Sequence, residues 1–175
     1  MKCKFAKKKL LICAIILVIC IIFVKPLLLN SVALNGKTLV SMDMAVVEAN
    51  RSPYTDGHFV AIDYDVLHIA KASNTITVYA WVFYGEYSYD GTSVKTEQAS
   101  HIPTVVTFDA ATSENSSTYD LLEYWIPGDG DSYAGDIRAK FPITLWLRAF
   151  DGSGAKRQAD NCMQAARKYY GAADS

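Results

Sequence analysis

The stretch TITVYAWVFY, residues 75–84, decides the fold of this chain. β-branched and aromatic side chains fill it, which is typical of a β-strand. On one face, the threonines at its start give way to Tyr79, Trp81 and Phe83, so its second half is apolar on both sides. A half-buried strand alternates apolar and polar residues, whereas a strand covered on both faces does not. The stretch therefore predicts a central strand.

Three further strands are predicted around this one. Residues 59–70 precede it across a turn at Ser73 and Asn74. Alternate positions of that segment form one largely apolar face, made of Val60, Ile62, Tyr64, Val66, His68 and Ala70. Residues 102–109 and 119–126 follow and form another hairpin. Because each adjacent pair is joined by a turn or loop, we predict a four-stranded antiparallel meander.

Apolar residues at helical spacing flank the predicted strands on both sides. Before them, Ser41 is suited to cap a helix over residues 42–50. After them, helices are predicted from Asp131 or Ser132 to residue 141, over residues 143–150 and over residues 155–170. The predicted class is α+β, with the sheet packed by an N-terminal helix and two or three C-terminal helices.

The first 34 residues form a leader of different composition, with six lysines and no acid. Five of these lysines precede an apolar run at residues 10–24. A basic flank of this kind stays in the cytoplasm. At about 1.5 Å per residue the run covers about 22 Å, which is short of a bilayer core of roughly 30 Å.

Two interpretations of the leader stay open. In the first, Lys25 snorkels to the outer interface while the leucines at 27–29 complete a transmembrane helix. In the second, the run is the core of a signal peptide, and Ser31-Val-Ala33 is its cleavage site. We favour the anchor, because the leucines make an unusually apolar approach to a cleavage site. Residues 35–175 are then an extracytoplasmic domain, secreted if the leader is cleaved.

The predicted exported domain is acidic and has one thiol. Residues 35–175 carry 11 lysines and arginines against 18 acids, a net charge of −7. Such a net charge gives no electrostatic case for binding nucleic acid or an anionic wall polymer. Cys162 is the only cysteine in this part, so no internal disulfide can form there.

Several sheet and capping patterns carry a family resemblance. They are residues 77–87, 102–108, 122–125 and 131–138, with the Phe141-Pro142 pair that ends the last of them. In these stretches the chain resembles an uncharacterised exported domain of Gram-positive bacteria, similar to the exported C-terminal region of BlaR-type antirepressor metallopeptidases. The resemblance implies an extracytoplasmic module of a sensor-like or envelope protein. The zinc signature His-Glu-x-x-His of the peptidase is absent, so the resemblance implies no metallopeptidase activity.

Aromatic residues beside a polar stretch mark the predicted ligand surface. Residues 85–100 are polar and turn-rich, and we expect them to form a loop. The predicted ligand-binding residues are Tyr84, Glu86, Tyr87 and Tyr89. Amphipathic rings often lie at binding surfaces, where they can stack on glycan rings.

Metal and catalytic sites have weaker support in the sequence. The three histidines lack partners at a spacing that forces convergence, so no metal site and no cofactor are predicted. Asp131 and Asp136, which could offer oxygen ligands to calcium, are explained by helix capping and first-turn charge. No nucleophile elbow or phosphate loop occurs, so we expect a protein that is not an enzyme. The alternative is a small envelope hydrolase using unidentified carboxylates, for which Glu86, Glu97 and Glu123 are candidates if they converge in space.

The sequence thus predicts a membrane-anchored extracytoplasmic binding domain. Its expected partners are the membrane, through the N-terminal helix, and either a membrane sensor protein or an envelope ligand. We expect it to belong to an envelope-sensing or antibiotic-response system.

Overall fold

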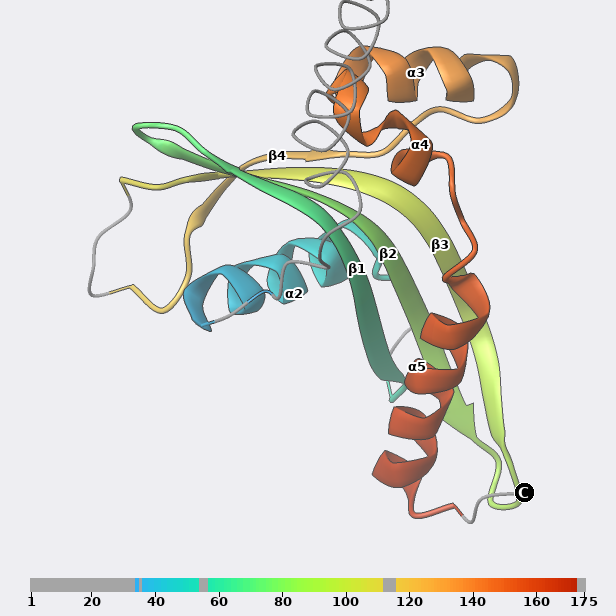
Figure 1. Ribbon diagram of the computed structural model, residues 1–175. Coiled ribbons are helices and arrows are strands. Elements are labelled where there is room, and N and C mark those ends of the chain that lie inside the picture. The colour runs from blue at the N-terminus through green and yellow to red at the C-terminus, as the bar shows by residue number, and fades with distance from the viewer. Residues whose placement is uncertain (1–33, 35, 54–56, 112–115, 173–175) are drawn as a thin grey trace, which may run out of the picture. The chain divides into compact units, whose positions relative to one another are not determined.

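A computed structural model describes residue 34 and residues 36–53, 57–111 and 116–172 (Figure 1). The apolar run of the leader lies outside these residues. Among the helices in the described part of the chain, none is both long and apolar enough to cross a bilayer. Residues 31–175 form one compact unit.

The described chain is α+β, and its centre is a four-stranded antiparallel sheet in the order β1-β2-β3-β4. The strands are β1 (Phe59–Lys71), β2 (Thr75–Tyr89), β3 (Val94–Asp109) and β4 (Asp120–Trp125). The predicted meander and its α+β class are confirmed. Stretch 75–84 lies in β2, which pairs with β1 on one side and with β3 on the other.

Helices cover both faces of the sheet. Helix α2 (Gly36–Asn50) lies on one face, and α5 (Ala155–Tyr170) packs across β1, β2 and β3 on the other (Figure 1). The segments between β4 and α5 are η1 (Gly130–Ser132), α3 (Tyr133–Lys140), η2 (Ile143–Leu145) and α4 (Trp146–Ala149). Ile137, Leu145 and Ala149 from these segments pack with Trp81 on the same face as α5. The three predicted C-terminal helical segments are therefore present.

The alternation along β2 assigns its side chains to the two layers. Even-numbered residues from Ile76 to Tyr84 join Met42 and Val46 of α2 in one cluster. Odd-numbered residues face the C-terminal helices, where Trp81 and Phe83 are buried. Burial on both faces explains why this strand lacks the polar positions of a half-buried one.

The predicted start of the first helix was wrong. Helix α2 begins at Gly36, five residues before Ser41. The Ser41 hydroxyl donates to the Lys37 carbonyl at 2.7 Å and accepts the Tyr119 backbone N–H at 2.8 Å. A serine can satisfy its hydroxyl on the carbonyl four residues earlier, so the same residue type that caps a helix also fits inside one. Ser41 thereby links α2 to the segment before β4.

The predicted face of β1 was wrong at its end. The register with β2 shifts between Val66 and His68, which marks a bulge with Leu67 as the extra residue. Leu67 therefore packs on the α5 side, and Ile69 replaces His68 on the α2 side. His68 is exposed.

The predicted loop at residues 85–100 was also wrong. β2 continues to Tyr89 and β3 begins at Val94, so a tight turn at 90–93 joins two long strands. Asp90 stabilises this turn by accepting the backbone N–H groups of Thr92 and Ser93, each at 2.9 Å. Pro103 consequently lies inside β3. Pro103 lies before the Val105–Asp109 segment, which is the part of β3 that pairs with β4. A missing backbone donor costs least outside such a paired segment.

Candidate functional site

The structure separates the four predicted ligand residues onto two faces of β2. Tyr84 and Glu86 lie on the α2 face, and Tyr87 and Tyr89 lie on the α5 face. Tyr84, Glu86 and Tyr87 are all at most 2 % exposed. Only Tyr89 presents a substantial surface, so these residues do not form the single exposed loop surface that the sequence predicted. Their ligand-binding role stays a prediction.

Glu86 is a buried carboxylate that ties the loop after α2 to the sheet. Its Oε1 accepts the Tyr84 hydroxyl at 2.5 Å and the Ser52 backbone N–H at 3.1 Å. His58 Nδ1 lies 3.9 Å from its Oε2. Burial and the bond to Glu86 raise the pKa of Tyr84 well above its usual range, so this hydroxyl remains a donor. Two donors and a buried position indicate a structural carboxylate.

Tyr87 and Tyr89 belong to an aromatic group where α5 ends. The Tyr170 hydroxyl donates to the Tyr87 carbonyl at 2.7 Å and accepts the Phe59 backbone N–H at 3.1 Å. Tyr89 stacks on Tyr170 with ring centroids 5.6 Å apart, and Tyr169 stacks on Phe59 at 4.4 Å. Tyr169 is exposed. This group closes the end of the sheet and leaves only the rings of Tyr89 and Tyr169 largely open to solvent.

The three carboxylates of the hydrolase alternative have different partners. Glu86 bonds to Tyr84 and Ser52, Glu97 accepts the Ser88 hydroxyl, and Glu123 pairs with Lys140. No hydrogen bond or ion pair found among the described residues joins two of them.

The described histidines and aspartates do not gather into a metal site. Within the described ranges, no group of three His, Cys, Asp or Glu side chains could hold an ion. His101 stacks on Trp81 at 4.5 Å, and its Nε2 lies 2.8 Å from Gln158 Oε1. Because the Gln158 oxygen is an acceptor, the imidazole Nε2 carries the proton; burial lowers the pKa of His101, which favours this neutral form. Asp136 accepts the Gly128 backbone N–H at 2.9 Å.

Charge is distributed very unevenly over residues 35–175. Residues 137–170 contain seven lysines and arginines and two acids, a net charge of +5. The rest of residues 35–175 contains four cations and sixteen acids, a net charge of −12. Most of residues 137–170 lies in α3, η2, α4 and α5. Counting from the start of α3 at Tyr133 adds Asp136, so these helices and their connections carry a net charge of +4 and form the more basic part of the domain. The net charge of −7 conceals this polarity.

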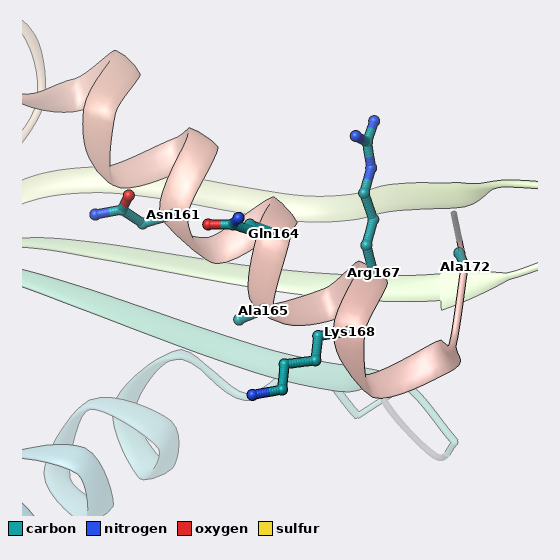
Figure 2. A pocket seen from close by; sticks show the side chains of 6 residues that line it. All are labelled: Asn161, Gln164, Ala165, Arg167, Lys168 and Ala172. Atoms are coloured by element: carbon teal, nitrogen blue, oxygen red, sulfur yellow. The ribbon is translucent and has the colours of Figure 1, made fainter. Parts of the chain in front are cut away.

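The outward face of α5 carries both cations and side-chain amides. A hollow of about 540 Å³ lies there, lined by Asn161, Gln164, Ala165, Arg167, Lys168 and Ala172. Figure 2 shows the two amides along the helix and the two cations extending in opposite directions from its last turns. A second hollow of about 370 Å³ shares Asn161, Gln164 and Arg167 and adds Asp160 and Met163. We call these six residues the α5 surface.

The chemistry of the α5 surface favours a polar, negatively charged ligand. Amide groups and cations donate hydrogen bonds, and none of the six lining residues is acidic. Lys156 and Arg157, nearer the start of α5, lie within ion-pair distance of Asp160 and Asp63 respectively. The α5 surface was missed because the sequence argument used the total charge of the domain, although the cluster of cations at 156–168 is visible in the sequence.

No protein-family model matches this chain, and no curated protein or solved structure matches it significantly.

Proposed function

We propose that the protein is an extracytoplasmic binding domain, anchored to the membrane by its leader, and that the α5 surface recognises an anionic envelope ligand or an acidic protein partner. The observation that carries this proposal is the charge polarity of the domain. A basic face on an otherwise acidic domain orients the approach of a charged partner and raises its association rate.

The buried sheet supports a role in binding through outer surfaces. Both faces of β2 are covered by helices, so the sheet itself offers no free face there for a ligand. Within the α5 surface the Asn161 amide already donates to Asp63 Oδ2 at 2.7 Å, so Gln164, Arg167 and Lys168 carry the binding argument. Exposed ion contacts are weak individually but add up over a ligand with several charges. The resemblance to the exported region of BlaR-type proteins supports a place beside an envelope sensor.

Retention on a polyanion resin tests the charge argument. We expect residues 31–175 to be retained on dextran sulfate at low ionic strength despite their negative net charge. The variant Arg167→Glu with Lys168→Glu should lose this retention. Lys37→Glu with Lys71→Glu is the matched control, because it changes the net charge equally in the first turn of α2 and at the end of β1.

Two results would contradict the proposal. Wild-type protein that flows through the resin would show that the basic face does not bind anions. Equal losses in the two variants would show that only net charge matters. Pull-down with the leader intact and deleted then separates a membrane partner from a free ligand, because a membrane partner should be lost with the leader.

A further inference from the structure

We propose that an apolar stripe on η2 and α4 docks onto the surface of an anionic lipid bilayer. The apolar stripe consists of Ile143, Leu147 and Phe150. Ile143 is 72 % exposed and Leu147 is 77 % exposed, although isoleucine and leucine are among the residue types most often buried. Their spacing of four and then three residues places all three on one side of a helical segment.

The apolar stripe is held outward by contacts on the inner side of the same segment. Leu145 and Ala149 are buried against the sheet. The Trp146 indole N–H donates to the Phe141 carbonyl at 2.9 Å, and the Arg148 guanidinium donates to the Leu67 carbonyl at 2.9 Å. With its inner side fixed in this way, the segment cannot rotate to bury the stripe without breaking these bonds.

The charges around the apolar stripe suit anionic lipid. Residues 137–150 contain three cations and no acid, with Asp136 and Asp151 directly outside this range, in a domain whose net charge is negative. Arg138 lies over the Phe150 ring at 5.6 Å from its centroid, so a positive charge lies beside the apolar stripe. Lys140 is paired with Glu123 and Arg148 is turned toward backbone carbonyls, which leaves Arg138 as the cation best placed for headgroups. Leucine, isoleucine and aromatic residues beside arginine are typical of segments that lie in the bilayer interface.

The leader provides the reason to choose a bilayer as the occupant. In this respect the inference rests on the proposed function, because it assumes that the leader anchors the chain. Only residues 30–35 separate Leu29 of the leader from α2, and six residues span at most about 22 Å. A domain held so close to lipid meets it at high effective concentration, so a weak second contact is sufficient.

Photo-crosslinking in vesicles tests this contact with the full chain. The chain is reconstituted into vesicles of equal parts phosphatidylglycerol and phosphatidylcholine, with a photoreactive amino acid at Leu147. The matched control places the same group at Met44, which is 59 % exposed on α2. We expect lipid adducts at residue 147 to exceed those at residue 44 about tenfold, and to fall severalfold in pure phosphatidylcholine.

A pair of variants tests whether the apolar side chains cause the contact. With the photoreactive group at Phe150, Ile143→Ser with Leu147→Ser should lower the lipid adduct about tenfold, because most of the apolar contact is lost. Val40→Ser with Met44→Ser, which removes two exposed apolar side chains elsewhere, should leave it unchanged.

The outcomes separate this inference from the proposed function. Equal lipid adducts at residues 44 and 147, or adducts with a second copy or another protein in place of lipid, overturn the docking. Carbonate extraction of the same vesicles reports on the anchor. A chain that resists extraction but gives no lipid adduct at residue 147 overturns the docking alone. A chain that is extracted overturns the anchor and the docking that rests on it.

Discussion

Replacing Gln158 by methionine should destabilise the domain strongly, although the two side chains have nearly the same length. Gln158 is fully buried between α5 and the sheet. Its Nε2 donates to the Asp63 carbonyl at 3.0 Å and to the Trp81 carbonyl at 3.5 Å, and its Oε1 accepts from His101 at 2.8 Å. These bonds attach α5 to β1, β2 and β3 together.

The size of the effect follows from the bonds that are lost. A hydrogen bond contributes about 1 kcal/mol net, and the bond to Trp81 is long, so we expect Gln158→Met to lower the free energy of unfolding by about 2–3 kcal/mol. Urea unfolding of residues 31–175, followed by tryptophan fluorescence, measures it. Gln164→Met is the matched control on the exposed side of the same helix and should cost less than about 0.5 kcal/mol.

A double variant tests whether the bond to His101 contributes. Gln158→Met leaves the His101 N–H without its acceptor, and adding His101→Phe removes that donor while keeping a ring against Trp81. The double variant should therefore be more stable than the sum of the single effects predicts, by about 1 kcal/mol. The reasoning is refuted if Gln158→Met changes stability no more than Gln164→Met does.

Two further substitutions or modifications test other parts of the core. Gly85→Ala should cost about 1–3 kcal/mol in urea unfolding, because its Cβ would lie 2.6–2.8 Å from the Tyr87 ring atoms; Gly135→Ala in α3, with no atom within 4 Å, should be neutral or stabilising. Burial raises the pKa of the Cys162 thiol from 9.0 to about 12, so native protein at pH 8 should react with Ellman's reagent far more slowly than protein in urea. Labelling of the native protein as fast as in urea would contradict this burial. Because the thiol of the unfolded chain ionises at lower pH than the buried thiol, its contribution to the free energy of unfolding should be constant below about pH 9 and should decline as pH rises toward 12.

The sheet was predictable because its central strand obeys a simple rule. The residues of β2 that the sequence placed on one face, including Tyr79, Trp81 and Phe83, do share a face. The end of β2 was missed because Tyr87, Ser88 and Tyr89 resemble loop residues in composition, although their alternation continues that of the strand. Composition indicates exposure, whereas pairing with β3 decides whether the segment is a strand.

The bulge at Leu67 and the buried part of the candidate site could not be read from one sequence. A bulge moves every later residue of β1 to the other face, and only the pairing with β2 reveals it. Tyr84 and Glu86 lie on one face of β2, where their side chains bond, whereas the sequence had grouped them with Tyr87 and Tyr89 on one surface. Tyr84 and Glu86 are buried because α2 and the loop after it cover them. The prediction of a loop at residues 85–100 did not include this cover.

The order of the elements along the chain explains where the basic residues lie. Helices α3 to α5 follow the sheet in the sequence and pack together on one face, so the cations of residues 137–170 are collected there by topology. Their inner sides hold the core through Gln158, Ala149 and Leu145, while their outer sides carry the α5 surface and the apolar stripe. Exposed side chains of this kind can change at a cost of about 0.5 kcal/mol or less, whereas the inner positions cannot. The binding properties proposed for this face can therefore vary independently of the fold.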